Sequence, residues 1–206
     1  MTFNELYKKL EDSTFNDTTT GSLFYNVYIC QYNVEDEYEV VKTLKGWEES
    51  LIRPANYIDV LLIDIFDEYC SFLDGKSFGK HESMFNYLIN KEKEDSQAVQ
   101  ETLIRNAGSD DFIAHIDKKI KAHLKKENDK KQPFIFFYGF GRIYPYLRVN
   151  AFLSNFERYN SGENIKILIF YPGKVSGNSF SLFGLLNDNH TYRSIKLFEE
   201  PLTIGD

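Results

Sequence analysis

Apolar runs without alternating polar positions mark the last third of the chain. The first run spans residues 133–138, the second spans 165–171, and a third begins at Ser181 in a stretch that ends at Phe198. A run of about four to eight apolar, β-branched and aromatic residues without period-two alternation is typical of a strand buried on both faces. Each run stops at a glycine, and a stretch with helical spacing follows. This pattern predicts strands that end at one crevice, where open α/β sheets place their ligands.

The earlier part of the chain continues the alternation of helix and strand. The expected elements are an opening helix over 3–10, a strand over 23–32, a helix over 34–52, a strand over 57–66 and a late helix over 143–159. Acidic residues in the first turn suit the helix over 34–52, and Pro145 suits the first turn of the late helix.

Residues from about 75 to 128 carry three apolar stripes at helical spacing, and Ser109 is a suitable N-cap for the last of them. We therefore predict an α/β fold, a three-layer sandwich of about five mostly parallel strands with helices on both faces. The segment 75–128 is expected to be a helical insertion within a single domain that spans 1–206.

Composition agrees with a globular α/β domain in the cytoplasm. The chain has 206 residues, of which 42% are hydrophobic and 16% aromatic. No apolar run approaches the roughly 18 residues that span a bilayer, and the N-terminus lacks the apolar core of a signal peptide. Cys30 and Cys70 have no CxxC partner, which favours buried reduced thiols over a metal site. We expect no membrane association.

The net charge of −7 argues against a protein whose main task is to grip nucleic acid. One segment departs from this balance, because residues 115–131 hold seven lysines against three acids. The lysines that could form a basic patch are Lys118, Lys119, Lys121, Lys125 and Lys126. They are explained either as a solvated helix face that complements the helix dipole or as a surface for DNA or an acidic partner.

Several stretches begin like catalytic or cofactor motifs, and each is incomplete. The segment 139–144 starts like a dinucleotide fingerprint, but Tyr144 stands in place of the third glycine. We expect its two glycines to let the backbone turn sharply between strand and helix. The segment 74–77 ends like a phosphate loop, but Cys70 stands in place of its first glycine. The acids of 64–68 are best explained as charge at a helix N-terminus. The four histidines have no metal-binding spacing, and we expect each of them to lie at the surface. We expect no catalytic residue, metal or cofactor.

Polar residues and glycines at the strand ends remain as candidates for binding a ligand or partner. They are Gly139, Gly141, Arg142, Tyr144, Arg148, Pro172, Gly173, Lys174, Asp188, Tyr192 and Arg193. Arginines and tyrosines beside a crevice can bind phosphate, carboxylate or an acidic loop of a partner. Alternatively, Arg148 and Arg193 pair with carboxylates such as Asp188 and hold the loops in place.

Three of these segments carry a family resemblance. Residues 139–148 (GFGRIYPYLR), 170–173 (FYPG) and 179–193 (SFSLFGLLNDNHTYR) resemble, in order and spacing, the BrxB family of bacteriophage-exclusion (BREX) defence systems. The aromatic strand and acidic helix near the N-terminus are similar too. The chain departs from the family pattern at residues 174–176, where Lys174 replaces an acid.

The resemblance implies a small component of a multi-protein defence complex, encoded beside an ATPase, a DNA methyltransferase and a phosphatase-like protein. We therefore predict a non-catalytic assembly or adaptor protein whose partners are those BREX proteins. Two other hypotheses stay open: a degenerate nucleotide-binding, P-loop-like protein, and a DNA-binding accessory that uses the lysines of 115–131.

Overall fold

The structure is a computed structural model that describes residues 1–16, 26–51, 58–126, 132–159, 165–176, 179–188, 195–198 and 200–205. The helices are α1 (Phe3–Glu11), α2 (Ser13–Asn16), the 3-10 turn η1 (Val34–Asp36), α3 (Glu37–Leu51), α4 (Ile65–Asp74), α5 (Met84–Glu92), α6 (Ser96–Ala107), α7 (Asp110–Leu124), α8 (Phe140–Ile143) and α9 (Val149–Phe156). The strands are β1 (Val27–Tyr32), β2 (Ile58–Asp64), β3 (Gln132–Tyr138), β4 (Lys166–Ser176), β5 (Ser179–Leu182), β6 (Leu186–Asp188) and β7 (Ile195–Lys196).

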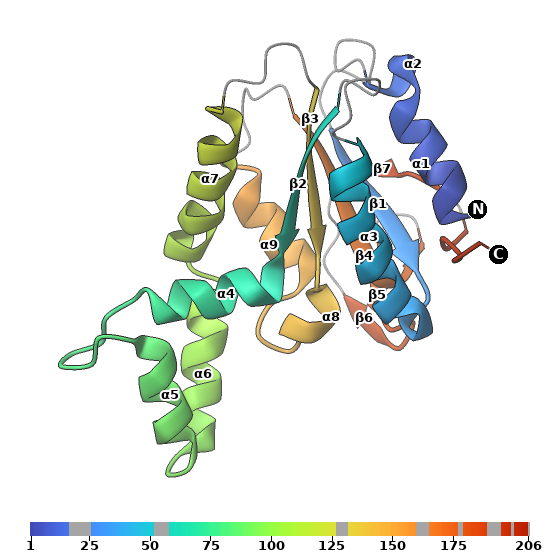
Figure 1. Ribbon diagram of the computed structural model, residues 1–206. Coiled ribbons are helices and arrows are strands. Elements are labelled where there is room, and N and C mark those ends of the chain that lie inside the picture. Colours follow the sequence, from blue (N-terminus) through green and yellow to red (C-terminus); the bar gives the residue numbers. More distant parts are fainter. Residues whose placement is uncertain are drawn as a thin grey trace.

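The central sheet has the order β2-β3-β4-β1-β7, and all of these neighbours pair in parallel. Its strands are buried on both faces, because successive side chains point alternately into two hydrophobic cores, one on each face of the sheet. Along β3, Phe134 and Phe136 pack with α1 and α3, whereas Ile135 and Phe137 pack with α4, α7, α8 and α9. Helices thus cover both faces of the sheet (Figure 1), and the predicted three-layer α/β sandwich is confirmed.

The helical middle of the chain is confirmed as well, and its helices begin at side-chain caps. Ser83, Asp95 and Ser109 each accept a hydrogen bond from a backbone amide in the first turn of α5, α6 and α7. Helices α5 and α6 project away from the sheet, whereas α7 returns to it (Figure 1). Met84, Leu88 and other buried residues of α5 and α6 pack in the same hydrophobic core as residues of α4 and α7.

The expectation that each C-terminal run ends at a glycine and leads into a helix is wrong for the second and third runs. Strand β4 continues through Pro172 and Gly173 to Ser176, and its last four residues pair antiparallel with β5. Strand β5 then turns directly into β6. The third run therefore forms a hairpin that extends the carboxyl end of β4, because pairing with β5 satisfies backbone groups beyond the parallel sheet.

The single helix expected over 143–159 is also wrong. The chain forms the short helix α8 before Tyr144 and begins α9 only at Val149. Pro145 lies in the connection and not in the first turn of α9. The connection between α8 and α9 runs beside the β5–β6 hairpin, where it lines one side of a groove described below.

Candidate functional site

The carboxyl ends of the parallel strands meet at one edge of the sheet, as the sequence predicts. Asp64 pairs with Tyr138 at the ends of β2 and β3, and Tyr32 at the end of β1 pairs with Pro172, the last residue of β4 that pairs with β1. Residues 139–148, 170–173 and 179–188 all lie at this edge or extend from it. The structure therefore brings together the described parts of the three segments that carry the family resemblance.

Asp64 organises the part of this edge near β2. Its carboxylate accepts hydrogen bonds from the amides of Phe66 and Asp67, at 3.1 and 3.3 Å, and so caps the N-terminus of α4. It also forms an ion pair with Arg142, whose guanidinium lies 3.3 Å from Asp67 and 5.5 Å from the centre of the Phe66 ring. The interpretation of acids 64–68 as helix N-terminal charge is confirmed, and Arg142 is held inside the fold by two of these acids.

Gly139 is required because the chain turns in the left-handed region directly beside this ion pair. Its φ is +83°, and a Cβ there would lie 2.6 Å from Asp64 Oδ1 and 3.3 Å from an Arg142 nitrogen. The prediction of a sharp turn is confirmed at Gly139. At Gly141 the reason is different: a Cβ would lie 3.0 Å from a carbon of the Phe183 ring and 3.2 Å from Pro172.

The β5–β6 turn packs on these glycines. Phe183 and Gly184 have φ values of +57° and +70°, and the Leu185 amide donates to the Leu182 carbonyl at 3.1 Å, which is the arrangement of a type I′ hairpin turn. The Phe183 amide donates to the Pro172 carbonyl at 2.9 Å. A Cβ on Gly173 would lie 3.1 Å from that amide nitrogen, so the backbones of β4 and β5 approach closely only because this residue is glycine.

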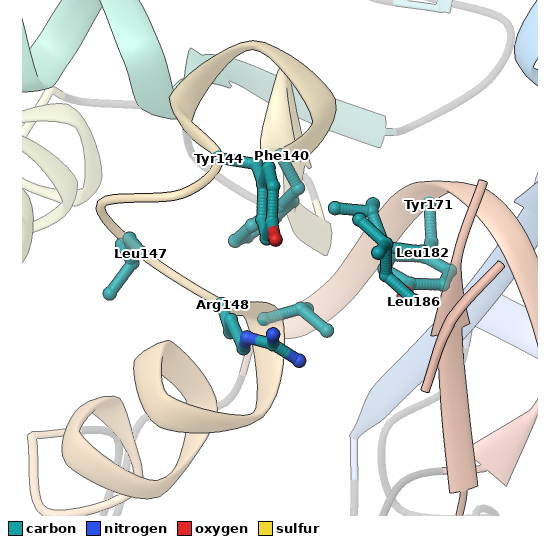
Figure 2. Close-up of a pocket in the computed structure, with 8 residues that line it drawn as sticks. Phe140, Tyr144, Leu147, Arg148, Tyr171, Leu182 and Leu186 are labelled. Carbon is teal, nitrogen blue, oxygen red and sulfur yellow. The ribbon is translucent and has the colours of Figure 1, made fainter. Parts of the chain in front are cut away.

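A groove opens between this hairpin and the connection from α8 to α9 (Figure 2). It is partly open to solvent, and its described lining residues are Phe140, Tyr144, Leu147, Arg148, Val149, Tyr171, Leu182 and Leu186. Arg148 is the one charged residue in this lining set, and its guanidinium lies 5.6 Å from the centre of the Tyr144 ring. Apolar and aromatic side chains therefore surround one arginine in this lining set.

The structure places the predicted site residues in two separate groups. Gly139, Gly141, Arg142, Pro172 and Gly173 pack against the chain's own side chains, whereas Tyr144 and Arg148 line the groove. Lys174 is exposed on β4 opposite Ser181. Asp188 ends β6, and the alternative that it pairs with Arg148 stays untested; Tyr192 and Arg193 lie outside the described residues.

Sequence reasoning missed the apolar lining of the groove. Phe140, Leu147, Tyr171, Leu182 and Leu186 come from segments up to 46 residues apart, as their numbers show, and each looks like ordinary core in the sequence. The available signal was their position beside the strand-end glycines, because residues next to such turns lie at the sheet edge.

The five lysines of the possible basic patch lie on α7 or just beyond its end. Lys119 forms an ion pair with Glu68, and Lys121 lies 2.8 Å from Asp117. Lys118, Lys125 and Lys126 are exposed.

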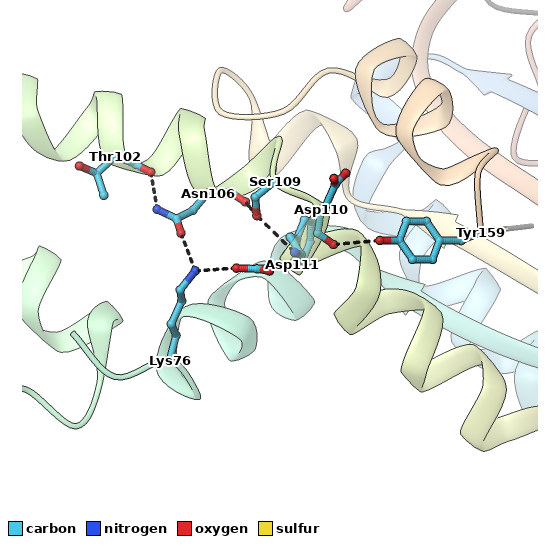
Figure 3. A network of polar contacts seen from close by, with 8 residues as sticks. Lys76, Thr102, Asn106, Ser109, Asp110, Asp111 and Tyr159 are labelled. Carbon is cyan, nitrogen blue, oxygen red and sulfur yellow. Dashed lines mark hydrogen bonds and ion pairs between the residues drawn. The ribbon is translucent and has the colours of Figure 1, made fainter. Parts of the chain in front are cut away.

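Polar contacts within the fold account for Lys76 and His123, two residues that the sequence offered as candidates for phosphate or metal binding. Lys76, the lysine of the incomplete phosphate loop, lies 3.3 Å from Asn106 and 3.2 Å from Asp111, and so links α4 to α6 and α7 (Figure 3). The expectation that every histidine lies at the surface is wrong for His123, whose side chain is 13% exposed and lies 2.9 Å from the Asp59 carboxylate. Cys30 is buried as expected, and Cys70 is half-buried.

Burial also sets the ionisation of two tyrosines at the strand ends. Desolvation, and secondarily the charge of Glu37, raises the pKa of Tyr32, whose hydroxyl donates a hydrogen bond to the Glu37 carboxylate. Desolvation likewise raises the pKa of Tyr138. Both hydroxyls therefore stay protonated at neutral pH.

Within the described ranges, no three His, Cys, Asp or Glu side chains gather closely enough to hold a metal ion. None of the helices in the described part of the chain is long and apolar enough to cross a membrane.

Comparison with known proteins identifies one family. A family model described as "BREX protein BrxB" matches residues 62–197. A curated "BREX protein BrxB" from Bacillus cereus (strain H3081.97) is 20% identical to the chain over 203 residues, which covers 96% of each protein. No solved structure matches the chain significantly.

Proposed function

The chain belongs to the BrxB family of BREX proteins, and from this premise we propose that it is a non-catalytic adaptor that assembles larger BREX subunits. Its proposed partners are the ATPase, the phosphatase-like protein and the DNA methyltransferase of the same defence system. Family membership makes the chain a BREX component, and the adaptor role rests on the organisation of the strand-end edge.

The observation that carries the proposal is that the chain's own side chains fill this edge. In nucleotide-binding α/β proteins, strand-end glycines leave space for a phosphate to approach the backbone. Here that space beside Gly139 is taken by Asp64 and Arg142, and beside Gly141 by Phe183 and Pro172. The Asp64 carboxylate would also repel a phosphate. These contacts favour a structural role for the glycines over a degenerate nucleotide site.

The lysines of α7 give weaker support to a DNA-binding role. Two of the five candidate lysines already pair with carboxylates, which lowers the positive charge available for phosphates. The edge instead presents an apolar groove with an arginine, and aromatic, apolar and arginine side chains dominate the energetics of protein interfaces.

Affinity purification tests the adaptor role. The tagged chain is expressed together with the complete set of its BREX genes, and the recovered proteins are compared with those from an untagged control. We expect at least one larger BREX subunit to be recovered in a stable ratio. Recovery of the tagged chain alone, at micromolar concentration and moderate salt, would contradict the proposal.

A thermal-shift assay of the pure chain addresses the nucleotide alternative. A ligand that binds the folded state raises stability by RT ln(1 + [L]/Kd), about 2.7 kcal/mol at one hundred times Kd. We expect millimolar ATP, GTP and dinucleotides, with or without Mg²⁺, to leave the melting temperature unchanged. A reproducible shift with one of them would favour the nucleotide-binding hypothesis.

A further inference from the structure

We propose that the exposed face of α6 pairs with the same face of a second copy of this chain, in an antiparallel arrangement about a two-fold axis. The proposal goes beyond the adaptor function and does not depend on it, because it concerns the pure chain alone. It is supported by the position of α6, by an apolar residue on its outer face, and by the charges on either side of that residue.

The position of α6 leaves one of its faces accessible. The arm formed by α5 and α6 projects away from the sheet (Figure 1), and Val99, Asn106 and Ala107 are the buried residues of α6. The residues that share the opposite face by helical spacing are exposed, and they are Gln97, Glu101, Ile104 and Arg105. Within the described part of the chain, this outer face of α6 is therefore in contact with solvent.

Ile104 is the apolar residue of the outer face. Its exposed fraction is 45%, and three of the seven large hydrophobic residues that are exposed in the described ranges lie within 75–107, namely Phe78, Ile89 and Ile104. Helix propensity does not explain an isoleucine here, because β-branched residues are weaker helix formers than leucine, alanine or lysine. Packing of Ile104 against another apolar side chain would remove this exposed surface from water.

Opposite charges lie beside Ile104 on the same face. Glu101 accepts a hydrogen bond from Gln97 at 3.2 Å, and neither Glu101 nor Arg105 forms an ion pair with a described residue. A two-fold axis that crosses the helix at the level of Leu103 places Glu101 of each copy opposite Arg105 of the other, because both residues lie two positions from that level. This reciprocity is what an isologous interface requires.

The same axis also brings the two isoleucines together. The rise of an α-helix is about 1.5 Å per residue, so each Ile104 lies about 1.5 Å from the level of the axis and the pair is about 3 Å apart along the helices. An isoleucine pair between two reciprocal ion pairs results. The charge pattern of α6 is thus complementary to itself, and it selects a second copy of this chain as the occupant.

Helix α3 offers an internal comparison. Lys45 and Glu49 are exposed and carry opposite charges at the same spacing of four residues, but no large exposed hydrophobic residue lies between them. Ion pairs at the surface contribute little without apolar burial. We therefore expect no pairing through this part of α3, and Lys45 and Glu49 provide matched control positions.

The contact is expected to be weak, because the outer face of α6 covers only about two to three turns. Interfaces that bury less than about 1,200 Å² in total are typical of transient association. We expect a dissociation constant on the order of 100 µM, so that the pure chain is a monomer at low micromolar concentration and associates at higher concentration.

Sedimentation equilibrium of the pure chain, from about 5 to 500 µM and without any BREX subunit, tests the proposal. The variants are Ile104→Glu, Glu101→Arg, Arg105→Glu and the double reversal that combines the last two. Lys45→Glu and Glu49→Arg are the controls, because they change the net charge by the same amounts on α3. Urea denaturation of every variant shows whether its fold is kept.

We expect Ile104→Glu and each single reversal on α6 to weaken association by about tenfold or more, since like charges then lie opposite each other. The double reversal should restore it to within about threefold of wild type. An equimolar mixture of the two single reversals should associate as well, because each supplies the charge that the other has lost. The α3 controls should change the dissociation constant by less than about twofold.

The outcomes separate this proposal from the adaptor function. A wild-type chain that stays monomeric up to the highest concentration overturns the pairing, and so does an association that the α6 variants leave unchanged. Neither result affects the adaptor function, which is tested with the larger subunits. If the chain stays monomeric and Ile104→Glu abolishes recovery of a BREX subunit, the outer face of α6 serves the adaptor function and the second copy is the wrong occupant.

Discussion

Replacement of Gly139 by alanine tests whether this glycine is structural. The residue has a φ of +83°, and a left-handed conformation costs an L-residue about 1–2 kcal/mol. The new Cβ would lie 2.6 Å from Asp64 Oδ1, so the carboxylate must move away from its position as the N-cap of α4. Loss of such a cap costs about 0.5–2 kcal/mol. We expect Gly139→Ala to lower the free energy of unfolding by about 2–4 kcal/mol, measured by urea denaturation.

Gly46→Ala is the matched control. Gly46 lies inside α3, and a Cβ there meets no described atom within 4 Å. Alanine is a better helix former than glycine, so this variant should be more stable by about 0.5–1 kcal/mol. The same substitution is thus expected to act in opposite directions at the two sites. A Gly139→Ala protein as stable as wild type would refute the structural explanation.

A double-mutant cycle separates the two costs at Gly139. In the background of Asp64→Ala, the Cβ no longer meets the carboxylate, and only the backbone cost of about 1–2 kcal/mol should remain. An undiminished effect of Gly139→Ala in that background would show that contact with Asp64 contributes nothing.

Two further perturbations follow from the same structure. Arg142→Ala leaves the nearly buried Asp64 without its cation and should cost about 1–3 kcal/mol in urea denaturation, whereas Arg158→Ala breaks an exposed pair and should cost less than about 1 kcal/mol; equal effects would contradict the assignment. Burial raises the pKa of the Cys30 thiol and the Tyr69 hydroxyl above their ordinary values of 9.0 and 10.0, so the unfolded chain loses these protons first. Stability should therefore be fully present below pH 9 and fall by up to about 1.4 kcal/mol per pH unit and group above those values, as measured by urea midpoints, and an unchanged midpoint up to pH 11 would contradict their burial.

The layers of this fold could be predicted because they depend on local hydrophobic patterns. The runs ending at Asp64 and Tyr138 are continuous because both faces of their strands are covered, and Ser109 caps its helix through a contact three residues away. Such signals are contained in a short window of sequence. The same reasoning failed at Gly173, where a glycine after an apolar run permits close approach of β5 and does not end the strand.

The site could be predicted only in part, since it depends on contacts between distant segments. Arg142 and Arg148 have the same local signal, an arginine after a strand-end glycine. The structure pairs the first with Asp64 and Asp67, and places the second in an apolar groove. The sequence contains no local sign of this difference, because the acids that pair with Arg142 lie more than 70 residues earlier in the chain, as their numbers show.

Light scattering on size-exclusion fractions tests the central claim most directly. The pure chain is mixed at micromolar concentration with each larger BREX subunit in turn, and the mass of every eluting species is measured. The adaptor function predicts a species whose mass equals the sum of the chain's 24.1 kDa and that of at least one subunit. Separate elution of the chain from all of them would contradict it.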